Sequence, residues 1–156
     1  MRRKDREQPY EWALKCADRS VWATLCTVNA DGSPYGTPVS IVREGERVYF
    51  HCAPEGQKVD NMRRDDRVAL VCVGQAREPA DRFTVEYESA VLRGRARELS
   101  GAAEKVRCLR LLCLRHTPAN MAAFDAEIAA LLPRTAVWEV TITEATGKRN
   151  APKTAA

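Results

Sequence analysis

Apolar and polar residues alternate along several segments of the chain, and this period of two restricts the fold more than any other feature. In residues 135–148, every second residue from Trp138 to Ile142 is apolar. Residues 82–100 alternate over a length beyond that of an ordinary strand. They predict either one long bent strand or two strands, with Gly94 at the bend.

Four more strands are expected earlier in the chain. Residues 20–42 predict two strands joined by Asn29–Ser33, where the pair Asp31-Gly32 is a strong hairpin signal. Residues 47–53, RVYFHCA, and residues 67–73, RVALVCV, predict two others. We therefore expect six strands, mainly antiparallel.

Apolar residues recur at helical spacing in three other segments. Residues 7–17 and 101–116 each predict an amphipathic helix. Residues 117–132 predict a third helix, with Thr117 as N-cap and Pro118 at the first helical position. Strands with helices at one end and a helical insertion late in the chain predict an α+β fold, a small closed or partly closed barrel with flanking helices.

Length and composition narrow the classes of protein further. The 156 residues suit one domain, 1–156, with a loose tail from about residue 150. Lys and Arg outnumber Asp and Glu by 25 to 21, and the excess is spread along the chain, so neither nucleic acid nor a membrane is expected as a partner. The six cysteines have neither Cys-x-x-Cys spacing nor zinc-ligand spacing to histidine, and no run approaches the ~20 apolar residues of a membrane span. We therefore expect a cytoplasmic protein with reduced cysteines and no metal site.

The most informative motif is residues 49–71, YFHCAPEGQKVDNMRRDDRVALV. An apolar strand reaches His51, a turn follows, and Lys58 comes early in a short helix before the next strand. A helix N-terminus offers free backbone N–H groups and the positive end of the helix dipole. The motif therefore predicts an anion site, and it leaves open whether the anion is a cofactor phosphate.

With these elements in place, the sequence resembles the pyridoxamine 5'-phosphate oxidase-like flavin-binding split-barrel family, most closely its branch related to nitroimidazole-resistance proteins. The resemblance runs through RRKDRE, GSPYGTPVSIV, VYFHCAPEGQKVDNMRRDDRVAL, YESAVLRGRARELS and ITEATGK. It implies a six-stranded split β-barrel and a homodimer, with flavin mononucleotide (FMN) at two equivalent sites on the dimer interface.

The resemblance also implies roles for residues of this chain. The strand Pro38–Ile41 would run beside the isoalloxazine ring, and Gln57 and Lys58 would hold the phosphate. His51 matches a His associated with the active site of nitroimidazole-resistance relatives, which makes it the catalytic candidate. The implied cofactor-binding residues are Pro38, Val39, Ser40, Ile41, His51, Cys52, Gln57, Lys58, Lys148 and Arg149.

The phosphate turn departs from the family pattern. Related oxidases carry Ser-Arg-Lys or a similar basic pair there, whereas this chain has Gly56-Gln57-Lys58, one charge fewer. No clear equivalent of the pyridoxamine phosphate-binding residues is found, so the vitamin B6 reaction is not expected. A solvated side chain is the alternative for Lys58, and a hydrogen-bonded residue on the barrel rim is the alternative for His51.

Other candidates have structural interpretations. Arg63 and Arg64 come late in the short helix, where basic residues stabilise its C-terminus. His116 is expected at a helix end between two helices rather than as a ligand. Cys52 and Cys72 are expected to be structural, because sequence gives no sign of a lowered thiol pKa.

The leading hypothesis is an FMN-dependent oxidoreductase that reduces a small acceptor such as a nitroaromatic compound or a quinone. The alternative is a flavin- or haem-binding protein without turnover, such as a redox sensor or a cofactor store, since some split-barrel relatives bind haem. FAD and haem are therefore further cofactor candidates. A nucleic-acid-binding module, suggested by the +4 charge, is disfavoured because basic and stacking residues do not cluster on one strand face.

Overall fold

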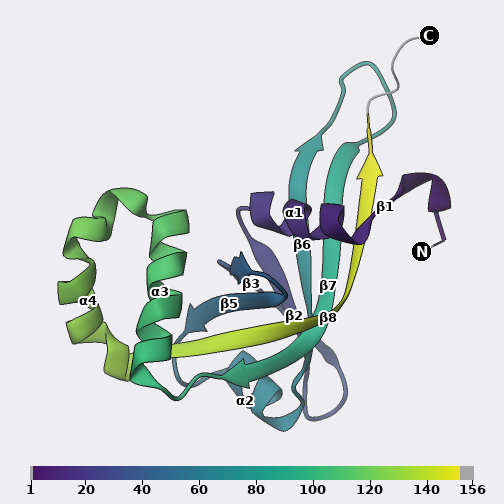
Figure 1. Ribbon diagram of the computed structural model, residues 1–156. Helices are drawn as coiled ribbons and strands as arrows, with labels where there is room; N and C mark the ends of the chain where they lie inside the picture. Colours follow the sequence, from purple (N-terminus) through teal and green to yellow (C-terminus); the bar gives the residue numbers. More distant parts are fainter. Residues whose placement is uncertain (1, 152–156) are drawn as a thin grey trace.

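The computed structural model describes residues 2–151 and builds them around one antiparallel β-sheet (Figure 1). The strands lie in the order β3-β2-β6-β7-β8-β5-β4, and β1 pairs with β8. Their bounds are β1 Glu7–Gln8, β2 Ala23–Val28, β3 Pro34–Val39, β4 Val42–Glu44, β5 Arg47–Cys52, β6 Arg67–Arg77, β7 Glu86–Glu98 and β8 Ala136–Asn150. The helices are α1 Tyr10–Arg19, α2 Gln57–Arg64, α3 Ala102–His116 and α4 Phe124–Leu131, with 3₁₀ helices at Lys4–Arg6, Pro118–Ala123 and Leu132–Arg134.

A link of two residues closes the sheet into a barrel. β3 and β4 lie at opposite ends of the strand order, yet β3 ends at Val39 and β4 begins at Val42. With only Ser40 and Ile41 between them, these strand ends lie within ~11 Å of each other, since successive Cα atoms are ~3.8 Å apart. The sheet must therefore curl until the end of β3 meets the start of β4, and Ile41 is completely buried at this seam. This is the α+β split barrel that the sequence predicts.

The inner face of the curled sheet holds the main core, and α1 packs across β6, β7 and β8 (Figure 1). The buried face of α1 is made of Ala13, Leu14, Cys16 and Ala17, mostly small side chains that let the helix lie close to the strands. Completely buried strand residues of this core include Leu25, Val48, Phe50, Leu70, Leu92 and Val140. The period of two places these side chains on one face of the sheet.

A second apolar cluster lies on the outer face, where α3 covers β5 and the start of β8 and α4 packs against α3. Tyr49 and Val137 contribute to it from the strands, and Leu109 and Phe124 contribute from the helices. Figure 1 shows α3 and α4 as a helical hairpin at one end of the sheet. Both faces of β8 are covered there, so the run Ala136–Val140 is buried without alternation.

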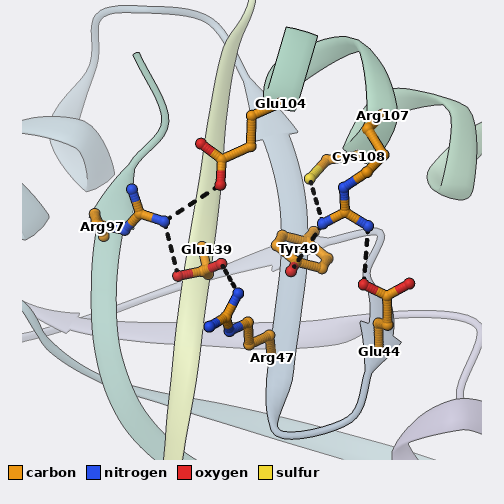
Figure 2. A network of polar contacts seen from close by, with 8 residues as sticks. All are labelled: Glu44, Arg47, Tyr49, Arg97, Glu104, Arg107, Cys108 and Glu139. Atoms are coloured by element: carbon orange, nitrogen blue, oxygen red, sulfur yellow. Dashed lines mark hydrogen bonds and ion pairs between the residues drawn. The ribbon is translucent and has the colours of Figure 1, made fainter. Parts of the chain in front are cut away.

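Glu139 is the residue most affected by this double covering. The alternation along β8 predicts Glu139 on the polar side, whereas in the structure it is 4% exposed. Figure 2 shows its carboxylate between two guanidinium groups, 3.1 Å from Arg97 and 3.7 Å from Arg47. A buried carboxylate needs such partners, because an unpaired charge is costly to remove from water.

Two arginines attach α3 at its two ends. Arg107, in the first half of α3, donates a hydrogen bond of 3.2 Å to the Tyr49 hydroxyl and lies over its ring (Figure 2). Arg115, in the last turn, donates to the backbone oxygens of Asp18 and Ser20, each at 2.7 Å, where α1 ends. These contacts position the hairpin against the barrel.

Most predicted elements are present, and two regions differ. All six predicted strands form, and residues 82–100 give one long strand rather than two. The short strands β1 and β4 are not predicted by the pattern. The helix expected over residues 7–17 begins only at Tyr10, because Glu7 and Gln8 pair with β8 instead.

The helix predicted over residues 117–132 is interrupted. Pro118–Ala123 is a 3₁₀ helix, and only Phe124–Leu131 is α-helical. Thr117 does not cap it, because the Thr117 hydroxyl donates to the backbone oxygen of Cys113 at 3.3 Å. A helix suited to crossing a bilayer is not found among residues 2–151. Most of the tail expected to be loose, residues 152–156, lies outside the described residues.

Gly94 marks an irregularity between β7 and β8. Arg93 lies opposite Glu144, but Gly94 lies opposite Ile142, so β8 carries one extra residue at this point. A Cβ atom at Gly94 would collide with the backbone oxygen of Thr141. The glycine singled out by the sequence as a bend thus lies opposite a bulge in β8, and the close approach of Thr141 requires glycine there.

Gly94→Ala is expected to lower the free energy of unfolding by about 1–3 kcal/mol, the usual cost of overpacking a site that cannot relax. Gly36→Ala is the matched control, because a Cβ at this strand glycine would meet the Thr24 methyl at 3.4 Å, an ordinary contact. The control should change stability by less than about 0.5 kcal/mol. Urea unfolding of both variants measures the difference, and equal losses would contradict the assignment.

Candidate functional site

A cavity of about 590 Å³ lies where the seam meets the α3–α4 hairpin. Ser40 and His51 line it from the sheet, and His116 lines it from α3. Most of the remaining wall is made of apolar side chains from the two helices and the segment between them. Two residues that the sequence places at a flavin site, Ser40 and His51, therefore share one cavity.

His51 lies near the end of β5, opposite Val137 of β8. The residue is exposed to solvent at this strand end. Partial desolvation by the surrounding protein still lowers the pKa of His51 below its usual 6.5, and the nearby His116 lowers it further. His51 is therefore mostly neutral at pH 7, and a neutral imidazole is able to take up a proton and pass it on.

His116 is attached directly to the seam. Its Nε2 lies 2.8 Å from the backbone oxygen of Ile41. A carbonyl oxygen only accepts, so Nε2 carries the proton and donates it. His116 does lie at the end of a helix, as expected, but its place in the cavity wall was missed. Leu109, Leu112 and His116 recur at helical spacing, and this stripe is the signal that could have revealed it.

The turn after β5 delivers the N-terminus of α2. Gly56 precedes the helix with a φ of 128°, which L side chains rarely adopt, and no side chain caps the helix. Lys58 lies in the first turn and is half-buried. None of the ion pairs found among residues 2–151 includes Lys58. Uncapped N–H groups beside an unpaired cation form an arrangement that suits an anion.

Cys52 lies between His51 and this turn. Burial raises the pKa of the Cys52 thiol, and the nearby charges of Lys58 and Arg63 offset this only in part. The thiol is therefore protonated at pH 7 and is a poor nucleophile. The raised pKa of the thiol supports a structural role for Cys52. Because Lys58 affects this pKa, its charge lies close to the end of β5.

A buried amide network fixes α2 to the β2–β3 hairpin. The Asn61 amide, completely buried, donates to the Thr27 hydroxyl at 3.0 Å and to the Asn29 side-chain oxygen at 2.8 Å. Gln57 donates to the same Asn29 oxygen at 3.2 Å. The Gln57 side chain therefore supports the helix, and its backbone N–H and Lys58 remain available at the helix start.

The segment Pro38–Ile41 contributes mainly backbone, and Ser40 is its one side chain among the residues that line the cavity. Val39 and Ile41 are buried, and Pro38 is exposed. Among the described strands β3 pairs only with β2, so its other edge has no strand beside it. This free backbone edge leads directly into the seam, next to the cavity.

Lys148 and Arg149 lie far from the other predicted site residues. Lys148 lies over the Tyr87 ring, 5.4 Å from its centroid, and Arg149 lies 3.5 Å from Glu88. From Val137, which is opposite His51, to Lys148 the strand covers roughly 35 Å at ~3.3 Å per residue. One chain therefore brings together the seam, His51, Cys52, Gln57 and Lys58, but not Lys148 and Arg149.

The fold defines the class of protein, a split barrel, and the turn beside its seam is a candidate anion site. The family model described as pyridoxamine 5'-phosphate oxidase matches residues 14–149, so the chain belongs to the pyridoxamine 5'-phosphate oxidase family. Comparison with the curated proteins gives no significant match.

Three solved structures are similar over most of the chain. The flavocytochrome Anf3 from Azotobacter vinelandii is 25% identical, with 92% of this chain and 68% of that chain covered and a TM-score of 0.74. The FAD and haem binding protein from Mycobacterium smegmatis is 19% identical, with 96% and 77% covered and a TM-score of 0.75. A Bacteroides thetaiotaomicron protein provisionally assigned to 5-nitroimidazole antibiotic resistance is 20% identical, with 90% and 84% covered and a TM-score of 0.73. The family and split-barrel fold implied by the sequence resemblance are confirmed.

His51 should make the protein less stable as the solution is acidified. The unfolded chain restores the usual pKa of 6.5, whereas the folded pKa is lower, so the unfolded state binds more protons between these two values. The contribution of His51 is therefore complete above pH 6.5 and is lost as the pH falls toward the folded pKa. His51→Gln does not titrate, so its thermal unfolding should depend less on pH below 6.5 than that of the wild type. Identical pH profiles would contradict the assignment.

Proposed function

We propose that this protein binds FMN and acts as an oxidoreductase that reduces a small acceptor such as a nitroaromatic compound or a quinone. The observation that carries the proposal is the convergence of an uncapped helix N-terminus, Lys58, a free strand edge and His51 within one chain. The family match and the likeness to an FAD and haem binding protein support a flavin. An absorbance spectrum of the protein as purified, followed by titration with FMN, tests the proposal.

The residues present fit a phosphorylated flavin. The free N–H groups at the start of α2 and the Lys58 ammonium would hold the phosphate, as helix N-termini commonly do. The unpaired backbone edge from Val39 to Ile41 would donate hydrogen bonds to the polar edge of the ring. When bound, the flavin supplies the redox chemistry, and the protein supplies orientation and electrostatics.

His51 is the candidate for proton transfer. It lines the cavity beside the seam, and its lowered pKa keeps a ring nitrogen free to accept a proton at neutral pH. The imidazole would take this proton from solvent, which reaches part of the side chain, and donate it to the acceptor. His116 would keep its own ring in one fixed orientation, because its Nε2 proton is donated to the backbone oxygen of Ile41.

A flavin- or haem-binding protein without turnover is the second candidate. Two histidines line one cavity, and imidazole is a common axial ligand of haem iron. Similar structures include a flavocytochrome and an FAD and haem binding protein. The same spectrum separates the candidates, because a flavin gives a double band and haem gives one intense band. Chromatography of the released cofactor distinguishes FMN from FAD.

We also propose a homodimer, located in the cytoplasm. The free edge of β3 and the exposed apolar side chains of Trp22 and Val73 offer surface for a second copy. Lys148 and Arg149 would reach a flavin only if it were bound across two chains. All six cysteines are free, which fits a reducing compartment.

Light scattering tests the dimer and should give twice the chain mass of 17.4 kDa. The mass of one chain with flavin bound would contradict the dimer.

Lys58→Ala should weaken FMN binding by about 1–3 kcal/mol, the range for a charge-assisted phosphate contact. Riboflavin, which lacks the phosphate, should bind almost equally to both proteins. Arg63→Ala is the matched control: it removes a positive charge from the same helix, but Arg63 is paired with Glu98 at 2.8 Å. Equal losses of FMN and riboflavin affinity would exclude Lys58 as the phosphate ligand.

His51→Ala should separate turnover from cofactor binding. FMN affinity should stay within about tenfold of the wild type, because the phosphate and ring contacts remain. The rate of acceptor reduction should fall roughly a hundredfold if the imidazole donates a proton. Stopped-flow oxidation by a nitroaromatic compound of the FMN-loaded protein, first reduced with dithionite under anaerobic conditions, measures this rate. Full activity with FMN bound would return His51 to the role of a rim residue.

A further inference from the structure

We propose that the cavity between the seam and the α3–α4 hairpin binds an uncharged, largely apolar ring compound, whose oxygen atoms face Ser40 and His51. That this compound is the electron acceptor rests on the proposed function. That the cavity selects such a compound rests only on the composition of its wall.

The size and wall of the cavity suit a small ring compound. Its volume of about 590 Å³ lies within the ~300–1,000 Å³ typical of ligand pockets. Leu109 and Phe124 form buried parts of the wall, and Met121 and Ile128 are partly buried there. An apolar ring of one or two fused units would replace water against these side chains and gain the usual hydrophobic free energy.

The charges around the cavity select against anions. Its lining contains no Lys or Arg among the described residues, and its one carboxylate, Glu127, is exposed. Two basic residues of α3 have partners elsewhere: Arg110 bonds to Asp125 at 2.8 Å, and Lys105 donates to the backbone oxygen of Leu132 at 3.4 Å. A carboxylate or phosphate in this wall would lose its hydration without gaining a partner.

Three polar residues, Ser40, His51 and His116, line the end of the cavity beside the seam. His116 uses its Nε2 proton on Ile41, whereas the Ser40 hydroxyl and the His51 imidazole have no hydrogen bond within residues 2–151. These two groups are able to bond to nitro or carbonyl oxygens of a ligand. The other polar lining residues are Thr117, Asn120, Glu127 and Thr135, and the hydroxyls of Thr117 and Thr135 already donate to backbone oxygens of Cys113 and Leu131. The end beside the seam therefore offers an imidazole and a hydroxyl that have no hydrogen bond within residues 2–151, and the ligand oxygens would bind there.

The cavity is distinct from the proposed phosphate site. Gln57 and Lys58 do not line it, so a phosphate held at the start of α2 lies outside its wall. Haem is less suitable than a neutral ring, because its two propionates would find no cation in the lining. The strand end that carries His51 and Cys52 runs from the cavity wall toward the turn before α2.

Binding of two matched probes tests the selectivity. 4-Nitrotoluene is uncharged and 4-nitrobenzoate is an anion of nearly the same shape, and calorimetry or ligand-observed NMR measures both with the full chain as purified. The wild type should bind 4-nitrotoluene at least about tenfold more tightly, because only the anion loses charge hydration. Equal affinity for the two probes, or binding of neither at millimolar concentration, would overturn the proposal.

Substitution of one wall residue by arginine should reverse the preference. Leu131 lines the cavity and is 38% exposed, so Leu131→Arg adds a cation without emptying the core. The variant should bind 4-nitrotoluene roughly fivefold more weakly and 4-nitrobenzoate more tightly. Leu114→Arg is the matched control, since Leu114 is 51% exposed on α3 and does not line the cavity. Identical behaviour of the two variants would contradict the site.

FMN titration of the same proteins separates this inference from the proposed function. FMN binding without any binding of 4-nitrotoluene would overturn the cavity assignment and leave the flavin proposal standing. Binding of 4-nitrotoluene without FMN binding would support the cavity and overturn the flavin proposal. Haemin that displaced 4-nitrotoluene and bound more tightly would assign the cavity to haem, against the selectivity proposed here.

Discussion

The two-residue link between β3 and β4 is the constraint on which the rest of the structure depends. Because Ser40 and Ile41 must join opposite ends of one sheet, the sheet closes on itself and places a backbone seam at its edge. His116 then bonds to the seam through Ile41, and Ser40 contributes to the adjacent cavity. The end of β5 lies at the same place, which brings His51 beside the link. Closure of the barrel thus brings the parts of the candidate site together, whatever the chemistry of their side chains.

Burial on both faces of the sheet sets the electrostatics at this end. The helical hairpin covers the outer face of β8, so Glu139 is removed from water and must be paired. An exposed ion pair contributes about 0–1 kcal/mol, whereas removing one partner from a buried charge costs about 3–5 kcal/mol. Arg47 and Arg97 are themselves more than half exposed, which screens them. Their role is mainly to avoid the cost of an isolated buried carboxylate, and the attachment of α3 depends more on its apolar face.

Local patterns predicted the strands well, because a period of two is a property of neighbouring residues. The same patterns could not reveal the seam: Ser40 and Ile41 continue the appearance of a strand, and only the strand order makes them a closing link. Glu139 reads as a polar-face residue because the helix that covers it lies far away in the sequence. His51 and Lys58 were identifiable because one short segment carries both, whereas the position of Lys148 relative to them depends on distances that one sequence does not contain.

The two walls of the cavity are attached to the barrel in different ways. Arg107 ties the first half of that helix to Tyr49, and the consecutive residues Arg115 and His116 tie its last turn to the end of α1 and to the seam. The opposite wall, α4, is short and lies between two 3₁₀ segments. Strain from an oversized guest would therefore be relieved by outward displacement of α4, while the α3 wall keeps its distance from His51. We therefore expect α4 to move when the pocket adapts to a larger ligand, and α3 to keep the polar end of the pocket aligned.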